Sequence, residues 1–173
     1  MVEFPRRRAA ALWLRRMLSA ALSCLAVAAI AGRCGGGALY TVRAGPSLLS
    51  WLGPSALFCL LAMAAGTSVF GSLLLELGCI MDGAAFGLVC ALMADGRLVT
   101  AHPMLLMELA VPVLILRAGL CAAVQAGAEG MLLAYGRGDE GGFRAALGSG
   151  CAVSLTAAGC VLAASALLRL AAG

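Results

Sequence analysis

Long apolar runs separated by short polar or glycine-rich stretches dominate the chain and predict membrane-spanning helices. A helix crosses a bilayer with about 20 apolar residues. The apolar run Ser55–Met93 would measure about 58 Å as one helix, against a hydrocarbon core of about 30 Å, so it is expected to fold back once. Glu76 and Gly78 are the expected break, because a charge favours water and glycine ends helices. The pattern therefore predicts five spans: Leu12–Ala31, Ser55–Leu75, Leu77–Met93, Met104–Gln125 and Ala145–Leu168.

Composition supports this class, an all-α polytopic transmembrane helical bundle forming a single domain over residues 1–173. The hydrophobic fraction is 63% and the charged fraction 12%, whereas soluble domains carry about 25% charged residues. A soluble globule of this size buries only about 70% of its surface. Soluble enzymes, disordered tails and disulfide scaffolds are thus excluded. The connections are expected at a loop over Gly32–Gly53, a tight turn over Ala94–Arg97 and a polar loop over Gly127–Arg144.

The basic residues predict the orientation of the bundle. All twelve are arginines, and their scatter argues against nucleic acid as a partner. Arginines favour the inner side of a membrane, so the N-terminus is expected inside and the C-terminus outside. The inner set is Arg6, Arg7, Arg8, Arg15, Arg16, Arg137 and Arg144, and the outer set is Arg33, Arg43, Arg97 and Arg169.

The first span has two interpretations. It could be a signal peptide cleaved after Ala29-Ile30-Ala31, or a span retained as an anchor. Since the following segment is again membrane, retention is the more natural. Arg15 and Arg16 are expected to extend to the lipid headgroups.

Three ionisable residues fall inside or close to the spans: Asp82, Glu108 and Arg117. Such residues are costly in lipid, so they are either paired for packing or part of an ion or proton pathway. Asp82, a few residues into its span, is expected near the interface, and Glu108 about one turn past Pro103. Glu108 and Arg117 are nine positions apart and lie on nearly opposite helix faces, so each needs a partner on another helix or water near a span end.

The residues of familiar catalytic and metal sites are missing from the sequence. His102 is the one histidine, so a zinc-protease pair is excluded, and Gly148-Ser149-Gly150 lacks the pattern of a nucleophile elbow. The eight cysteines show no C-x-x-C spacing and are interpreted as small hydrophobic residues. We therefore expect no enzyme, no metal and no cofactor.

Small residues four positions apart form the richest pattern. Gly83 and Gly87 make a G-x-x-x-G step, and Gly119 and Gly159 each precede an alanine at the same spacing. Such residues share one helix face and allow close helix packing, so these faces are expected to hold the bundle or a partner. Pro112, in the middle of its span, is expected to kink it.

The central segment, about Leu57–Gln125, resembles stage II sporulation protein M and its wider family of integral membrane proteins. The resemblance rests on Gly66-Thr67-Ser68-Val69-Phe70-Gly71, on Gly83-x-x-x-Gly87 after eleven intervening residues, and on a span carrying Pro112 and Arg117-Ala118-Gly119-Leu120. The Arg-rich N-terminus and the five spans are also similar.

The resemblance implies a non-enzymatic scaffold of the engulfment machinery in the membrane of endospore formers, at the sporulation septum. Its implied partners are stage II sporulation proteins D and P, which cut peptidoglycan, besides the lipid bilayer itself. The alternative from the residues is a small transporter or channel subunit that uses Asp82, Glu108 and Arg117.

Overall fold

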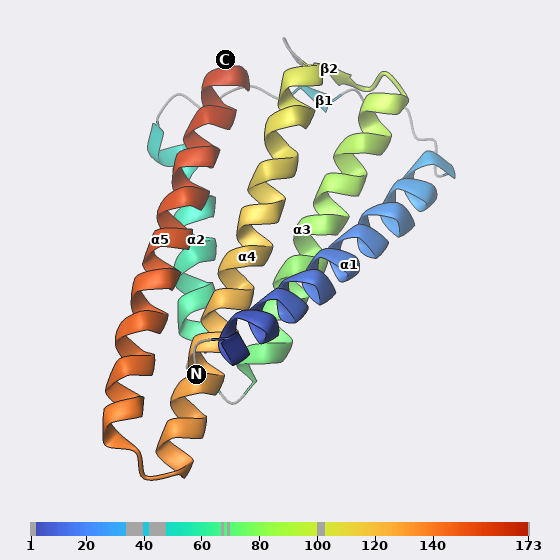
Figure 1. The fold of residues 1–173 in the computed structure, drawn as a ribbon. Helices are drawn as coiled ribbons and strands as arrows, with labels where there is room; N and C mark the ends of the chain where they lie inside the picture. The colour runs from blue at the N-terminus through green and yellow to red at the C-terminus, as the bar shows by residue number, and fades with distance from the viewer. Residues whose placement is uncertain are drawn as a thin grey trace.

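The computed structural model describes residues 3–33, 40–41, 48–66, 68, 70–99 and 103–172, and this part of the chain is a bundle of helices (Figure 1). Two two-residue strands, β1 (Tyr40–Thr41) and β2 (Leu98–Val99), pair in parallel between connecting segments. The helices are α1 (Glu3–Arg33), α2 (Leu48–Gly66), α3 (Gly71–Ala94), α4 (Pro103–Gly136) and α5 (Glu140–Ala172).

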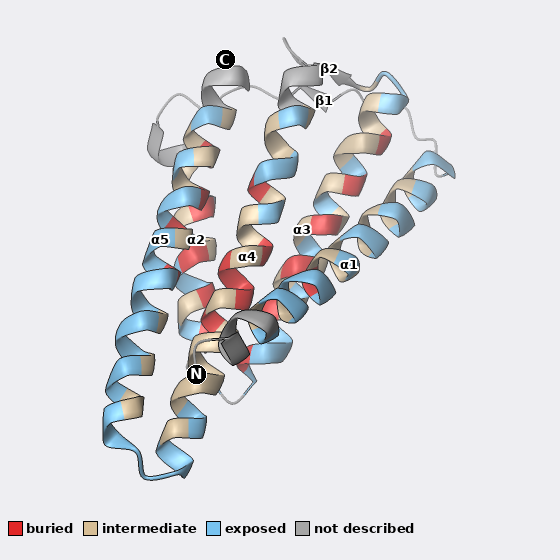
Figure 2. Cartoon of the chain, in the orientation of Figure 1, coloured by how far each residue is buried: buried red, intermediate tan, exposed pale blue. Residues whose placement is uncertain are grey.

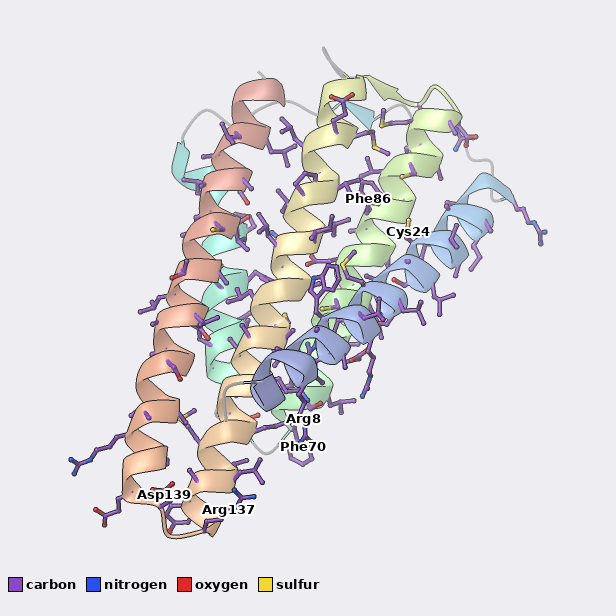
Figure 3. The ribbon with its side chains drawn as sticks, in the orientation of Figure 1. Arg8, Cys24, Phe70, Phe86, Arg137 and Asp139 are labelled. Atoms are coloured by element: carbon purple, nitrogen blue, oxygen red, sulfur yellow. The ribbon has the colours of Figure 1, made fainter. Side chains whose placement is uncertain are left out.

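Successive helices run in opposite directions, so the two termini lie toward opposite ends of the bundle (Figure 1). The α4–α5 connection lies at the end of the bundle where α1 begins, whereas α5 ends at the opposite end, where the two strands also lie. Arg8, Arg137 and Asp139 therefore share one end of the molecule (Figure 3). Arg33 ends α1 and Arg97 follows α3, both at the opposite end, as the prediction requires, and Arg43 lies outside the described residues. The assignment of the end with Arg8 to the inside stays a prediction.

The distribution of side chains is that of a membrane protein. Large apolar residues such as Leu18, Leu60 and Leu73 are more than 60% exposed around the outside (Figure 2). The buried core consists mostly of alanine and cysteine, together with a few leucine and valine residues. Lipid tails solvate exposed leucines, while small residues let helices approach closely. The predicted class, an all-α transmembrane bundle, is confirmed.

Helix lengths agree with about five spans. Among the described residues, four helical segments are long and apolar enough to cross a membrane: Arg8–Arg33, Gly71–Ala94, Met107–Gly136 and Glu140–Leu168. The apolar part of α2 is shorter, Leu52–Gly66, but the whole helix of 19 residues extends about 28 Å, close to the thickness of a hydrocarbon core.

The predicted break at Glu76 and Gly78 is wrong. The chain turns between Gly66 and Gly71, where the Gly71 amide donates to Ser68 O at 3.0 Å. A Cβ on Gly71 would overlap the carbonyl oxygen of Ala65, so this tight reversal requires glycine. Glu76 does not need water because Arg15 of α1 lies 3.4 Å from its carboxylate.

The predicted polar loop over Gly127–Arg144 is also wrong, because α4 continues to Gly136 and only three residues separate it from α5. Gly138, with a φ of 65°, forms a Schellman cap in which the Asp139 amide donates to Ala134 O at 3.1 Å. The Asp139 carboxylate then accepts from the Gly142 amide at 2.8 Å and begins α5.

The tight turn expected over Ala94–Arg97 is confirmed by the same kind of cap. Gly96 has a φ of 66°, and the Arg97 amide donates to Leu92 O at 2.9 Å. α4 is continuous through Pro112, which is exposed, and a bend of its axis there stays a prediction.

Gly83 and Gly87 hold the bundle together by packing against α1 of the same chain. A Cβ on Gly83 would overlap the carbonyl oxygen of Ala20, and one on Gly87 would lie 2.9 Å from the Cα of Cys24. The Ser23 hydroxyl adds an interhelical hydrogen bond to Ile80 O at 3.0 Å. This face is thus occupied within the monomer.

The other small residues differ in their surroundings. Gly66 packs closely against Val124, whereas a Cβ on Gly119 would lie an ordinary 3.9 Å from Trp13. Gly159 has open space around it and faces outward on α5. The G-x-x-x-A pattern around Gly159 therefore makes no close helix contact within the described chain.

Candidate functional site: an intramembrane ion pair

Asp82 and Arg117 form an ion pair between α3 and α4, in which Arg117 Nη1 donates to Asp82 Oδ1 at 2.7 Å. Because α3 begins at Gly71 rather than Leu77, Asp82 lies about 16 Å along its helix, near the middle of the span. Its expected place at the interface is therefore wrong. Both side chains are mostly buried, at 19% and 17% exposure, so each meets the other's need for an opposite charge in lipid.

Arg117 connects this pair to two further helices. Its Nη2 donates to Ser55 Oγ of α2 at 3.0 Å, and Ser55 Oγ lies 2.9 Å from Ser165 Oγ of α5. Ser165 in turn donates to Val161 O at 2.8 Å. The guanidinium carbon also lies 4.7 Å above the centre of the Phe58 ring, a cation–π contact.

The four polar residues Ser55, Asp82, Arg117 and Ser165, here called the polar node, therefore join α2, α3, α4 and α5 inside the bundle. Asp82 Oδ2 and Arg117 Nε have no hydrogen-bond partner among the described residues. The ion pair therefore keeps one hydrogen-bond acceptor, Asp82 Oδ2, and one donor, Arg117 Nε, that are not used in contacts between the described helices.

A second polar cluster joins α1 to α4, closer than the polar node to the end of the bundle where α1 begins. Arg16 is 1% exposed, and its Nη2 donates to the Gln125 side-chain oxygen. Gln125 Nε2 donates to Glu129 Oε1 at 2.9 Å, and Arg8 Nε lies 2.9 Å from Glu129 Oε2. The expectation that Arg16 extends to the headgroups is therefore wrong, because its side chain turns into the bundle. Arg15, at 65% exposure, stays at the surface.

The remaining predicted charge, Glu108, is exposed near the beginning of α4. It lies on a different part of α4 from the polar node, as the nine-residue spacing from Arg117 predicts. His102 lies outside the described residues.

The chemistry available to the polar node is charge pairing and hydrogen bonding. Within the described residues, no group of three or more His, Cys, Asp or Glu side chains is arranged to hold a metal ion. The fixed donors and the single carboxylate suit the bracing of helices, and they also provide one site where a proton or small ion could pair with Asp82.

Sequence reasoning identified both members of the ion pair but missed Ser55, Ser165, Arg16 and Gln125. Ser55 and Ser165 carry a weak signal, since hydroxyls within spans often hydrogen-bond across helices. The sequence signal at Arg16 was misleading. Arg16 adjoins Arg15 at the start of an apolar run, but only Arg15 lies at the surface.

No protein family, no curated protein and no solved structure was found to match this chain.

Proposed function

We propose that the chain is a non-enzymatic integral membrane scaffold. The observation that carries this proposal is the use of its intramembrane charges: Asp82 and Arg117 pair with each other, and Arg117 also binds Ser55. Charges used in this way brace a bundle rather than line an open path. The large apolar side chains around the outside remain available to lipid and to other membrane proteins.

We also propose a more specific role, which rests on the resemblance of segment 57–125 to the stage II sporulation protein M family. The scaffold would anchor a peptidoglycan-remodelling complex during endospore engulfment and would bind stage II sporulation proteins D and P in the cell membrane at the septum. Short connections support an anchoring role, since the α3–α4 connection and the three-residue α4–α5 turn leave little chain outside the bundle. A scaffold of this kind needs packed spans and no catalytic residues.

Co-purification tests this assignment directly. The tagged chain is co-expressed with stage II sporulation proteins D and P in a heterologous bacterium and captured in mild detergent. We expect both hydrolases to be retained, and an unrelated polytopic protein with the same tag to retain neither. If neither hydrolase is captured with a chain that still elutes as a folded species, the assignment to this machinery is wrong.

The second candidate is a small transporter or channel subunit, favoured by one observation: Asp82 lies in mid-span with one carboxylate oxygen that has no hydrogen-bond partner in the described part of the chain. Proton and solute flux into liposomes separates the two functions. The scaffold predicts flux no greater than that of empty liposomes. Flux that is abolished by Asp82→Asn or Glu108→Gln would instead establish transport.

A further inference from the structure

An apolar groove of about 460 Å³ lies between α2 and α3. Leu61 and Ala65 of α2, Leu74 and Met81 of α3 and Cys121 of α4 are among the residues that line it, and none of the lining residues is charged. Leu61 and Met81 are 60% and 63% exposed, so the groove is open to the lipid around the bundle. Its surroundings therefore favour an apolar occupant that the membrane itself supplies.

The groove extends along the bundle over the depth of one lipid leaflet. On α2 its lining begins at Phe58, and it reaches Ser68 in the turn between α2 and α3. Ten positions at the helical rise correspond to about 15 Å, which is half of a hydrocarbon core of about 30 Å. On α3 the lining ends at Met81, which directly precedes Asp82 in the middle of its span.

Exposed arginines indicate that the turn end of the groove lies at the lipid headgroups. The side chains of Arg8 and Arg15 are 53% and 65% exposed, which suits the headgroup region but is costly in hydrocarbon. Phe70, in the turn, lies at the same end of the bundle as Arg8 (Figure 3). The groove therefore runs from the headgroups to the middle of the bilayer, in the leaflet on the side where α1 begins.

The width of the groove distinguishes between a lipid chain and a helix of another protein. A volume of about 460 Å³ over about 15 Å gives a mean cross-section of about 31 Å². A helix with its side chains is about 10–12 Å wide and needs about 80–110 Å². A single hydrocarbon chain has no side chains and is much narrower. The dimensions therefore favour one lipid chain over a partner helix.

We propose that this groove is a binding site for one acyl chain of a phospholipid, taken from the leaflet on the side where α1 begins. The ester end of the chain would lie near Ser68 and its methyl end near Phe58. The Phe58 ring also contacts Arg117, whose guanidinium carbon lies 4.7 Å from the ring centre, so the end of the acyl chain would pack beside the polar node. The site follows from the groove alone, whether the chain is a scaffold or a transporter.

Retention of phospholipid by the full chain tests the proposal. The protein is reconstituted in nanodiscs of palmitoyl-oleoyl phosphatidylglycerol and transferred to detergent, and native mass spectrometry counts the phospholipids that stay bound. Ala64→Phe places a ring in the groove, and Ala152→Phe places the same ring on the exposed surface of α5 as the matched control. We expect one phospholipid per chain in the unaltered protein and the control, and roughly tenfold lower occupancy in Ala64→Phe.

Photochemical cross-linking locates the bound chain. A phospholipid with a diazirine at the methyl end of one acyl chain should insert at Phe58 or Met81, and this insertion should persist after transfer to detergent. Insertion at Leu155, which is 64% exposed on α5, comes from bulk lipid and should disappear. A diazirine beside the ester should instead insert near Ser68.

Equal phospholipid retention by Ala64→Phe and Ala152→Phe would overturn the proposal. So would the absence of retained phospholipid from a folded chain, or insertion of the methyl-end diazirine at Ser68 instead of Phe58 or Met81. If Ala64→Phe fails to fold, the cross-linking pattern of the unaltered chain still decides the outcome.

Discussion

Arg117 of α4 donates a 2.7 Å hydrogen bond to Asp82 of α3, across 35 positions of sequence. The sequence alone predicts that Arg117 needs a partner on another helix or water near a span end, and the structure shows that its partner is Asp82, a residue expected near the interface. Ser55 extends the contact to α2. One arginine thereby connects three helices in the middle of the bundle, where lipid offers no competing hydrogen bonds.

Removal of either member of this pair should destabilise the bundle more than removal of both. Asp82→Asn or Arg117→Gln leaves one buried charge unpaired, at an expected loss of about 3–5 kcal/mol in the free energy of unfolding. The double variant should lose clearly less than the sum of the two. Reversible unfolding by SDS in mixed micelles measures all three, with Glu108→Gln as the exposed control. Strictly additive losses would contradict the pairing.

The close contact of α1 with α3 should not tolerate side chains at Gly83. A leucine there would overlap Ala20 O, so Gly83→Leu should cost at least about 1–3 kcal/mol or separate α1 from the bundle. Gly159→Leu is the matched control, since nothing lies within 4 Å of a Cβ there. Thermal melting of both variants in detergent provides the measurement. Equal melting temperatures would show that this face does not pack against α1.

Loss of the Gln125 side-chain hydrogen bonds should lower the free energy of unfolding more than loss of the Arg15–Glu76 ion pair. Gln125→Leu removes the hydrogen bonds to Arg16 and Glu129, at an expected cost of about 1–3 kcal/mol. Arg15→Gln breaks an ion pair whose arginine is 65% exposed and whose carboxylate is 16% exposed, and we expect a smaller loss of about 0.5–1 kcal/mol. Unfolding of the two variants by SDS measures both losses in the free energy of unfolding. A larger loss for Arg15→Gln than for Gln125→Leu would show that Arg16 is not held inside the bundle.

The two ends of the bundle should differ in their access to a membrane-impermeant maleimide. In a variant without native cysteines, Asp95→Cys and Glu140→Cys place exposed thiols at opposite ends. With the N-terminus inside, the residue 95 thiol is labelled in intact cells, and the residue 140 thiol only after permeabilisation. Labelling in the reverse order would invert the orientation, and labelling of both in intact cells would contradict five spans.

Apolar run length and charge spacing were sufficient for much of this protein. They predicted helical spans, the turn at Gly96, and the separation of Arg8 and Arg137 from Arg33 and Arg97. They also identified Asp82 and Arg117 as candidate intramembrane charges. These features are local or compositional, because a bilayer requires long apolar helices wherever the chain crosses it.

The places where prediction failed share one cause, the neutralisation of a polar residue by a distant helix. Glu76 suggested a break because its partner Arg15 lies 61 positions earlier in the sequence. Glu129 suggested a loop because its ion pair with Arg8 depends on how α1 crosses α4. Glycines added to the error, since those at 127 and 130 lie inside a helix that packs closely against α5.

The sequence by itself determined the class of the protein, the number of its spans and the identity of its central charges, because the bilayer imposes these locally on the chain. The tertiary structure decided where α2 ends, that Asp82 lies in mid-span opposite Arg117, and that Arg16 is buried and bound to Gln125. Those outcomes depend on which helix faces meet, and in lipid that choice is made by close packing and pairing between segments far apart in sequence.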